Sequence, residues 1–453
     1  MSGADRLRRH APLTVLRLPG GELWSGGAEE AAEAIRHEPD AAVVLYDVFT
    51  TRPSGSVMAL CGLLDAPREV RRLEFDLLSG GRSVPRRSHR FSDRYLAPQP
   101  PLERGGWAPL MELEVAEAAE LEVRVGGESV RLAVPANPFA DLARVDLAQQ
   151  TLQRDYDARW VRDHSLFHHR AHRYGRILFY DNMSSDAGRI ADELRGLDEG
   201  LEVAWVDWPV PLERRRWSSA AKRYVRYWGG SQRAAYTHGF HLFGHSARFI
   251  SHFDLDEYLH NGSGRDLVEY LESRTAGLPF RYIKERRFTE RAEAPPGSLP
   301  RAWHFRQRAL MRDNFDKPIC ATGGRSILYV NTHTVHTSLA PPALPRRVRF
   351  RQALNPRSLW LAWRWRGQAL GAGWRKHAWE RALARHGNVQ PWLPGEELAY
   401  FHLKGINNGW RRPPRARPLL SLGGRVARAL WPRRARDGRL AALMRELGLT
   451  DDR

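Results

Sequence analysis

Short stretches in which apolar and polar residues alternate fill the first third of the chain. Four of them have the length and pattern of β-strands: Ala42–Phe49, Met111–Val115, Leu121–Val125 and Val130–Val134. Gly126 and Gly127 join the last two stretches, which is typical of a hairpin turn. The pattern therefore predicts a small antiparallel β module over residues 1–145, and we identify no catalytic chemistry in it.

Residues 146–340 alternate apolar runs of strand length with amphipathic helical stretches. The expected strands are Ile177–Tyr180, Leu201–Trp208 and Phe249–Leu259. The expected helices begin near Ser185, with Ile190, Leu194 and Leu197 on one face, and cover Ser231–His241 and Leu267–Leu271. Alternating strands and helices predict βαβ units, and thus an α/β domain with a mostly parallel sheet whose ligands bind at the carboxyl ends of the strands.

The composition favours folded domains outside a membrane. Of the 453 residues, 42% are hydrophobic and 10% aromatic, which is enough to build cores. No stretch approaches the apolar length of a membrane-spanning helix, and no apolar signal-peptide core follows the polar start of the chain. The two cysteines, Cys61 and Cys320, form no CxxC motif, which excludes a disulfide framework and a cysteine zinc site. We therefore expect a cytoplasmic protein.

Positive charge is concentrated in the last quarter of the chain. The whole chain has 71 Lys and Arg against 52 Asp and Glu, a net charge of +19. Residues 341–453 hold 24 of the basic residues against 7 acidic ones, which gives 24 − 7 = +17 and leaves 47 − 45 = +2 for the remainder. The same segment holds eight of the 16 Trp residues, and we expect it to form a basic helical extension.

Three interpretations of this extension are open. Trp and Arg residues are interleaved over about 357–385, at Arg357, Trp360, Trp363, Arg364, Trp365, Arg366, Trp374 and Arg375. Such a stretch suits an interfacial helix on anionic lipid at the inner face of a membrane. It equally suits an Arg-rich solvated face with the Trp side chains packed onto the rest of the protein. Binding of nucleic acid is the least favoured of the three.

The sequence His252–Leu259, HFDLDEYL, is the strongest candidate for chemistry. On a strand, Asp254 and Asp256 project to one face about 7 Å apart, while Phe253 and Leu255 point into the core. Two such carboxylates form a hard-oxygen site for Mg²⁺ or Mn²⁺, completed by waters and a diphosphate. Solvated carboxylates are the alternative, because a DxD pair alone is a weak motif and Asp155–Asp157 is another.

The turn that follows the expected strand Ile177–Tyr180 is the second candidate. Its residues 181–186, DNMSSD, include Asp181 and Asn182, whose oxygens can hold the ribose and base of a nucleoside at the carboxyl end of a strand. Ser184 or Ser185 is expected to cap the following helix, with Asp186 near its positive end.

Histidines recur every four residues on an expected helix, at His164, His168 and His172, with His169 beside them. The spacing places three of them on one face, which suits a zinc or nickel site. We favour a structural role, because no matching carboxylate or cysteine is identifiable.

Residues 146–410 resemble the nucleotide-diphospho-sugar glycosyltransferases of family 92 and related family-2-like bacterial enzymes. The resemblance rests on motifs in a fixed order: Thr151–Asn182, VDWP at Val206–Pro209, QRAAYTH at Gln232–His238, FDLDEYL, Lys317-Pro318-Ile319, His333 and His336, and HLKGINNGW at His402–Trp410. It implies a GT-A fold with Mn²⁺ or Mg²⁺, and it implies that the segment His402–Trp410 folds back onto the catalytic domain.

Site roles follow from the same resemblance. The residues implied to contact the nucleotide-sugar are Thr151, Gln153, Asp155, Asp181, Asn182, Gln232, Asp254 and Lys317. Asp254 and Asp256 match the metal-binding pair, and His336 and His402 are candidates for a further metal ligand. Tyr156 departs from the family pattern, which often has Asn there. Lys317 and Lys404 are candidates to balance the charge of a diphosphate.

The implied reaction is displacement at an anomeric carbon by a deprotonated acceptor hydroxyl. Candidate catalytic carboxylates are Glu257, Glu285, Asp313 and Asp316, among which the sequence leaves the choice open. The resemblance implies an inverting hexosyltransferase acting on a glycan or lipid-linked acceptor. The alternative is a non-enzymatic carbohydrate- or nucleic-acid-binding protein on a degenerate transferase fold.

Overall fold

The structure is a computed structural model of the chain. It describes residues 7–38, 41–50, 57–61, 73–79, 81–83, 88–91, 110–114, 120–197, 200–210, 213–218, 223–228, 231–275, 280–288, 301–302, 307–309, 316–322, 327–331, 334–337, 397–403, 434–436 and 439–450. The Trp/Arg-rich stretch 357–385 lies outside these residues. Within the described part of the chain, no helix has both the length and the apolar character needed to cross a bilayer.

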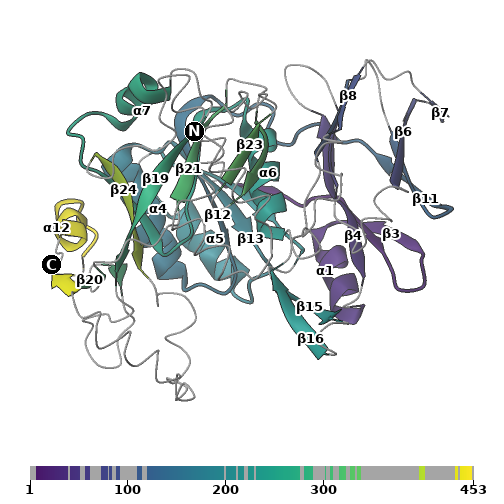
Figure 1. The fold of residues 1–453 in the computed structure, drawn as a ribbon, viewed down its shortest axis with the longest axis horizontal. Coiled ribbons are helices and arrows are strands. Elements are labelled where there is room, and N and C mark those ends of the chain that lie inside the picture. Colours follow the sequence, from purple (N-terminus) through teal and green to yellow (C-terminus); the bar gives the residue numbers. More distant parts are fainter. Residues whose placement is uncertain are drawn as a thin grey trace, which may run out of the picture.

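An eleven-stranded sheet occupies the centre of the molecule (Figure 1). Its strands, in chain order, are β1 (Leu7–His10), β12 (Val145–Gln153), β13 (Arg176–Asp181), β14 (Glu202–Asp207), β17 (Ala247–His252), β18 (Glu257–Asn261), β19 (Phe280–Phe288), β20 (Gln307–Ala309), β21 (Asp316–Ala321), β24 (Leu398–Leu403) and β25 (Arg434–Arg436).

The strand order divides this sheet into a parallel and a largely antiparallel half. The order is β1-β14-β13-β12-β17-β21-β19-β20-β25, and β24 pairs with both β18 and β19. The first five strands are parallel to their neighbours, which confirms the predicted parallel sheet. Strands β21, β19, β20 and β25 continue it in antiparallel pairs, and β24 runs parallel to β19.

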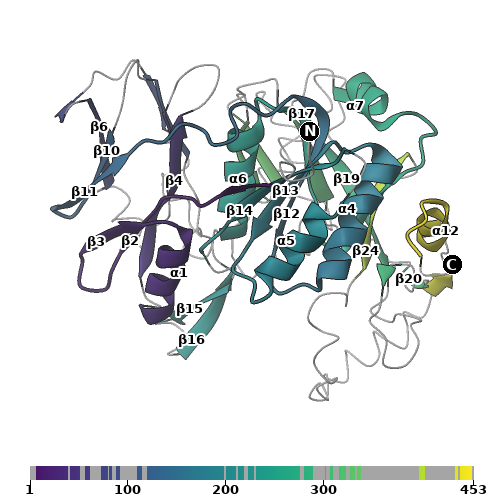
Figure 2. The same ribbon diagram turned by 180° about the vertical axis from the view of Figure 1, so that it is seen from behind.

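Helices cover both faces of the parallel half. On one face, α4 (Ala158–His172) and α5 (Ala187–Arg195) pack against alternate residues of β13, including Ile177 and Phe179 (Figure 2). On the other face, α6 (Ser231–Phe243) packs against Leu178 and Tyr180. Helix α12 (Arg439–Glu446) contributes apolar side chains to the same buried cluster as α4 and α5, whereas α7 (Leu267–Thr275) contributes to a separate one.

The N-terminal part forms two antiparallel sheets, as the alternating pattern predicts. One sheet has the order β3 (Leu23–Gly26), β2 (Thr14–Arg17), β4 (Ala42–Thr50), β5 (Val57–Cys61), β9 (Leu110–Glu114), β8 (Ser88–Phe91). The other has the order β11 (Glu128–Ala133), β10 (Glu120–Val125), β6 (Leu73–Ser79), β7 (Arg82–Ser83). Gly126 and Gly127 turn the β10–β11 hairpin with φ of 63° and 99°, conformations that glycine adopts readily.

The β module shares its core with the central domain. Helix α1 (Ala28–His37) and β4 place Ile35 and Phe49 in the same buried cluster as Tyr180 of β13. The rings of Tyr46 and Trp208 stack with centroids 5.5 Å apart. Strand β1, from the start of the chain, lies at the edge of the central sheet beside β14. The sequence pattern did not predict this strand, because its residues LRRH lack an apolar run.

Two hairpins stand apart from the main sheets. One consists of β15 (Glu213–Ser218) and β16 (Arg223–Trp228) and projects from the body in both ribbon views (Figures 1 and 2). The other consists of β22 (Ile327–Asn331) and β23 (Thr334–Thr337) and packs near α6, where Thr237 donates a hydrogen bond to the carbonyl of Val330.

Candidate functional site

The carboxyl ends of the five parallel strands lie at one edge of the central sheet. Strand β12 has β13 on one side and β17 on the other, so the direction of the strand order reverses between β12 and β17. Open α/β sheets bind ligands in the crevice at such a switch point. Gln153 and Asp181 end β12 and β13, and the acidic sequence HFDLDEYL follows β17 at this edge.

Asp254 and Asp256 lie in a turn, not on a continuous strand. Strand β17 ends at His252 and β18 begins at Glu257, and the N–H of Glu257 donates to the carbonyl of Asp254 over 2.9 Å. The predicted strand Phe249–Leu259 is therefore wrong in its middle, and the two carboxylates do not share a strand face. Phe253 and Leu255 are buried as predicted, because both sides of this turn pack into the core.

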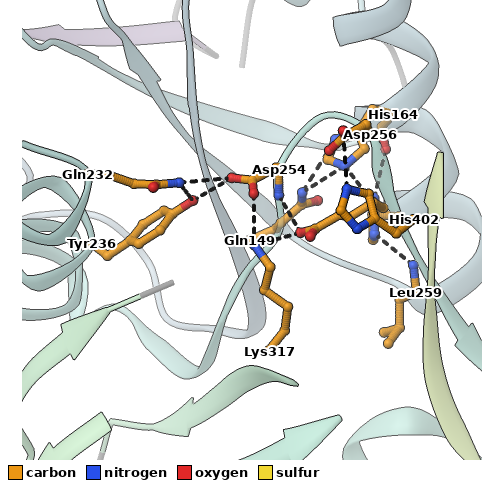
Figure 3. Close-up of polar contacts among 11 residues, drawn as sticks. Gln149, His164, Gln232, Tyr236, Asp254, Asp256, Leu259, Lys317 and His402 are labelled. Carbon is orange, nitrogen blue, oxygen red and sulfur yellow. Dashed lines mark hydrogen bonds and ion pairs between the residues drawn. The ribbon is translucent and has the colours of Figure 1, made fainter. Parts of the chain in front are cut away.

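Asp254 is held by three side chains from two other elements (Figure 3). Its Oδ1 accepts hydrogen bonds from the Tyr236 hydroxyl at 2.8 Å and from Nε2 of Gln232 at 3.3 Å, both from α6. Its Oδ2 lies 2.9 Å from Nζ of Lys317 in β21. The sequence identified Gln232 and Lys317 but missed Tyr236, although its i+4 spacing from Gln232 on a helix was a usable signal.

Lys317 also binds Glu257. Its Nζ lies 2.7 Å from Oε2 of Glu257, which in turn accepts the backbone N–H of Asp254 at 2.9 Å. Glu257 is 1% exposed. Burial raises the pKa of Glu257, and the adjacent Lys317 ammonium opposes this rise. Burial alone would lower the pKa of Lys317, but the Asp254 and Glu257 carboxylates outweigh it and raise that pKa above its usual value, so the ammonium is charged.

Asp256 faces the opposite way, toward β24. Nε2 of His402 lies 3.4 Å from Oδ2 of Asp256, and Glu257 adds a third donor atom to a cluster whose members are all within 4.8 Å of one another. The N–H of Leu403 donates to the carbonyl of Asp256 at 2.7 Å, so β24 is fastened directly to the acidic turn. Carboxylate oxygens with one imidazole suit Mn²⁺ and similar divalent ions, so these residues fit the implied metal.

β24 returns the chain from the C-terminal segment into the site. Glu257 of β18 pairs with His402 in antiparallel register, and β19 flanks β24 on the other side. Residues 398–403 thus fold back onto the central domain, while Lys404 and the rest of His402–Trp410 lie outside the described residues. His336 lies in β23, and its side chain is also outside the described part.

The turns after β12 and β13 form a polar corner that consists of Gln153, Asp155, Asp181, Ser184 and Ser185. Nε2 of Gln153 donates to Oδ1 of Asp181 at 2.5 Å and to Oγ of Ser184 at 2.9 Å. Oδ1 of Asp155 accepts from the N–H and hydroxyl of Ser185 at 2.8 and 3.1 Å. The expected capping of α5 by either serine is wrong, because Ser184 and Ser185 are engaged with this corner, and Asp186 at the N-cap makes no side-chain capping hydrogen bond.

The corner is strained and partly desolvated. Asp155 and Met183 have φ of 55° and 63°, in the left-handed region that non-glycine residues rarely adopt. Burial raises the pKa of Asp181. Tyr156 links the corner to the acidic turn: burial and then the nearby Asp256 and other carboxylates raise the pKa of its phenol. Strained turns of this kind concentrate at binding sites.

Five of the residues expected to contact the nucleotide are buried, namely Thr151, Gln153, Asp181, Asn182 and Lys317. The amide of Asn182 donates to the carbonyls of Trp208 and Val210 at 3.0 and 2.6 Å, which fastens the end of β14. Thr151 is 1% exposed, and its hydroxyl has no hydrogen-bond partner among the described residues. Asn182 therefore has a structural role in the corner. The side chains of the catalytic candidates Glu285 and Asp316 lie outside the described residues, as does all of Asp313.

The histidines of α4 have the structural role that we favoured. Nε2 of His164 donates to the carbonyl of Glu257, and Nε2 of His172 to that of Leu259, both over 2.9 Å. Nε2 of His168 accepts the N–H of Leu259 at 3.3 Å. Burial lowers the pKa of His164 and of His172 to about 4, so the rings are neutral and fasten β18 to α4.

Comparisons with known proteins give little further information. No family model and no curated protein matches the chain. Among solved structures, S. aureus TarS 1-349 is similar with a TM-score of 0.24 and 11% identity, covering 54% of this chain and 72% of that chain. The same TarS fragment matches in complex with UDP-GlcNAc (TM-score 0.25, 10% identity) and with UDP (TM-score 0.24, 11% identity). A likeness this low carries no argument about function.

Proposed function

We propose that the chain is a divalent-metal-dependent nucleotide-sugar transferase with a GT-A type catalytic domain. One observation carries the proposal: the metal-ligand cluster of Asp256, Glu257 and His402 lies at the switch point of the parallel sheet, beside the polar corner of Gln153 and Asp181. A metal site and a nucleoside-sized polar corner at one sheet edge suit a nucleotide that carries a diphosphate.

The two aspartates of the acidic turn have different roles in this proposal. Asp256 and His402 are the metal ligands, and Glu257 lies in the same cluster. Asp254 is instead oriented by Lys317, Tyr236 and Gln232, which leaves it to contact the donor substrate. When bound, Mn²⁺ or Mg²⁺ supplies the positive charge that stabilises a leaving nucleoside diphosphate.

The polar corner holds the nucleoside in this proposal. The carboxylate of Asp181 lies at the end of β13 and is buried, and Gln153 fixes its orientation through the 2.5 Å hydrogen bond. Asp155 is fixed in the same way by Ser185. Tyr156 lies between the corner and the acidic turn, where an aromatic ring suits stacking on a base.

In this proposal, Glu257 is not the catalytic base. A base must reach the acceptor hydroxyl, whereas Glu257 is 1% exposed and bonded to Lys317 and the N–H of Asp254. We therefore assign Glu257 a positioning role and retain Glu285 and Asp316, from β19 and β21, as candidates for the base. Inversion at the anomeric carbon, a glycan or lipid-linked acceptor, and attachment of the basic tail to an anionic membrane surface inside the cell belong to the same proposal.

Calorimetric titration with UDP and GDP, with and without Mn²⁺, tests this function. We expect binding that requires Mn²⁺ and is lost in Asp256→Asn. A screen of sugar nucleotides for Mn²⁺-dependent hydrolysis then identifies the donor without knowledge of the acceptor. Absence of nucleotide binding together with tight, salt-sensitive binding of DNA would contradict the proposal and favour a non-enzymatic nucleic-acid-binding protein.

A further inference from the structure

A second cluster of metal-ligand side chains lies away from the acidic turn, where β1, β4 and α6 meet. His10 ends β1, Asp47 lies within β4, and His238 lies on α6. Nε2 of His10 and Nε2 of His238 are each 2.8 Å from Oδ2 of Asp47. The side chains of Asp47 and His238 are fully buried, and that of His10 is 10% exposed. The three residues come from segments far apart in the sequence.

The remaining polar atoms of the buried ligands are already fixed by other groups. Oδ1 of Asp47 accepts the backbone N–H groups of Leu13 and Val48 at 3.0 and 2.9 Å. Nδ1 of His238 lies 2.7 Å from the hydroxyl of Tyr180. Metal-binding histidines and carboxylates are typically oriented by such outer contacts. What converges at the centre is one carboxylate oxygen and two imidazole nitrogens.

The buried carboxylate needs a positive charge beside it. The Asp47 side chain is fully buried, and the two imidazole Nε2 atoms at 2.8 Å are the nearest groups able to carry that charge. The backbone N–H groups of Leu13 and Val48 also donate to this carboxylate, but they carry no net charge. A buried anion is costly without a cation. The cation is therefore either a proton on an imidazole or a metal ion.

Aromatic rings pack against both imidazoles of the cluster. The rings of Phe139 and His10 are nearly perpendicular, with centroids 6.1 Å apart. The ring centroids of Phe49 and Trp208 lie 5.5 and 5.3 Å from that of His238. An apolar surround strengthens the electrostatic contribution of an ion bound inside it.

We propose that His10, Asp47 and His238 bind one Zn²⁺ ion, separate from the metal of the acidic turn. Two imidazoles and one carboxylate are a donor set that Zn²⁺ favours over Mg²⁺. In the structure the two imidazoles are hydrogen-bonded to Asp47. On zinc binding, each Nε2 and Oδ2 of Asp47 donates a lone pair to the metal, and each imidazole carries its proton on Nδ1. His238 then donates Nδ1–H to Tyr180, and an imidazolium proton, where present, is released to solvent.

The ion would fasten three parts of the molecule together. It would join β1 at the edge of the central sheet, β4 of the β module and the helix α6. The same helix carries Gln232 and Tyr236, which hold Asp254 in the acidic turn. Zinc at this position would therefore stabilise the framework of the candidate site without contacting its ligands.

Zinc content of the full chain tests the proposal. The protein is made without a histidine tag in an Asp256→Asn background, which removes a ligand of the acidic turn. It is incubated with ZnCl₂, passed over gel filtration and analysed by mass spectrometry. We expect about one Zn²⁺ per chain, as for a site with three protein ligands. Asp47→Asn should weaken binding at least about tenfold and remove the zinc-dependent rise in melting temperature.

Two further variants keep the test decisive. His245→Gln is the matched control, because His245 donates to the carbonyl of Phe139 nearby but is outside the cluster, so zinc binding should persist. If Asp47→Asn does not fold, His10→Gln at the less buried edge replaces it, with the same loss expected. Asp256→Asn protein that retains no zinc, or an Asp47→Asn variant in this background that retains as much zinc as the Asp256→Asn protein, overturns the proposal and identifies a proton as the buried cation.

Discussion

Nζ of Lys317 lies 2.9 Å from Oδ2 of Asp254, so the first carboxylate of the DxD motif is paired with a buried lysine of a neighbouring strand. The same ammonium lies 2.7 Å from Glu257. One cation thus compensates two carboxylates, while Asp256 on the other side of the turn faces His402. The acidic turn is charged asymmetrically, and this asymmetry determines how its variants should behave.

Replacement of Lys317 by Met should be strongly destabilising. The variant leaves Asp254 and Glu257 beside each other without a buried cation, and breaking a buried ion pair in this way costs about 3–5 kcal/mol. Urea unfolding at neutral pH measures the loss. Adding Glu257→Gln to Lys317→Met should restore part of the stability, because it removes one of the stranded charges. A loss below about 1 kcal/mol in the single variant would contradict the buried pairing.

The two DxD motifs should behave differently when their last aspartate is changed. Asp256→Asn should abolish Mn²⁺-dependent nucleotide binding, because it removes a metal ligand from the cluster with His402. Asp157→Asn is the matched control: Asp157 caps α4 by accepting the N–H of Arg159 at 3.0 Å. It should leave Mn²⁺ binding unchanged and lower stability by no more than about 1 kcal/mol. Calorimetry on both variants makes the comparison, and equal Mn²⁺ affinity in both would contradict the assignment.

Stability should fall as the pH decreases below about 6.5. Burial lowers the pKa of His172 to about 4 in the folded protein, whereas an unfolded histidine titrates near 6.5. The unfolded state therefore takes up the proton first, and the stability contributed by the neutral ring is complete above about pH 6.5 and is lost toward pH 4. For one such histidine the loss between pH 7.5 and 5.0 is about 2 kcal/mol.

His172→Gln checks this pH dependence. The glutamine amide keeps a donor for the carbonyl of Leu259 but does not titrate. Urea unfolding of both proteins at pH 7.5 and 5.0 should show a pH-dependent loss that is smaller in the variant by about 2 kcal/mol. An identical pH dependence in the two proteins would mean that His172 is accessible to protons in the folded state.

A larger side chain at Gly239 on α6 should displace the amide of Gln150 and destabilise the protein. A Cβ atom there would lie 2.3 Å from Nε2 of Gln150, whose amide donates to the carbonyl of Ala235 on the same helix. Gly239→Ala should therefore lower stability by about 1–3 kcal/mol. It should also weaken Mn²⁺-dependent nucleotide binding, because α6 carries Tyr236.

The control for this variant is Gly188→Ala. Gly188 lies in α5, and a Cβ atom there would meet nothing within 4 Å. The exchange should be neutral or stabilise the helix by up to about 1 kcal/mol, because alanine has the higher helix propensity. Thermal unfolding of both variants separates the two effects, and equal melting temperatures would contradict the close packing of α6 on β12.

The apolar patterns predicted the parallel half of the sheet well. Ile177–Tyr180 and Leu201–Trp208 fall on β13 and β14, since continuous apolar runs are typical of strands buried on both faces. The acidic turn was misread as strand, because Phe253 and Leu255 are both buried and imitate the two-residue period of a strand. This alternation arises because both sides of the turn pack into the core, and not because the residues form a strand. Sequence alone therefore does not reveal the turn.

Pairings that span long stretches of chain were beyond the sequence patterns. The salt bridge of Lys317 with Asp254 exists because β21 lies beside β17, a neighbour relationship without local signal. His402 was identified only through the family resemblance. The cluster of His10, Asp47 and His238 was missed altogether, because its residues sit singly in three unrelated segments. Sequence patterns reveal candidate ligands that lie within one short motif. They do not reveal ligands that the strand topology brings together from distant segments.

The late position of β24 in the chain has a consequence for how the protein is made. By the time a ribosome has released residue 321, the strands from β12 to β21, the acidic turn and Lys317 have all been synthesised. His402 follows only after a further stretch of translation. A chain that stops before residue 402 therefore holds Asp256 without its imidazole partner, and the proposed metal cluster is completed only after His402 has been synthesised.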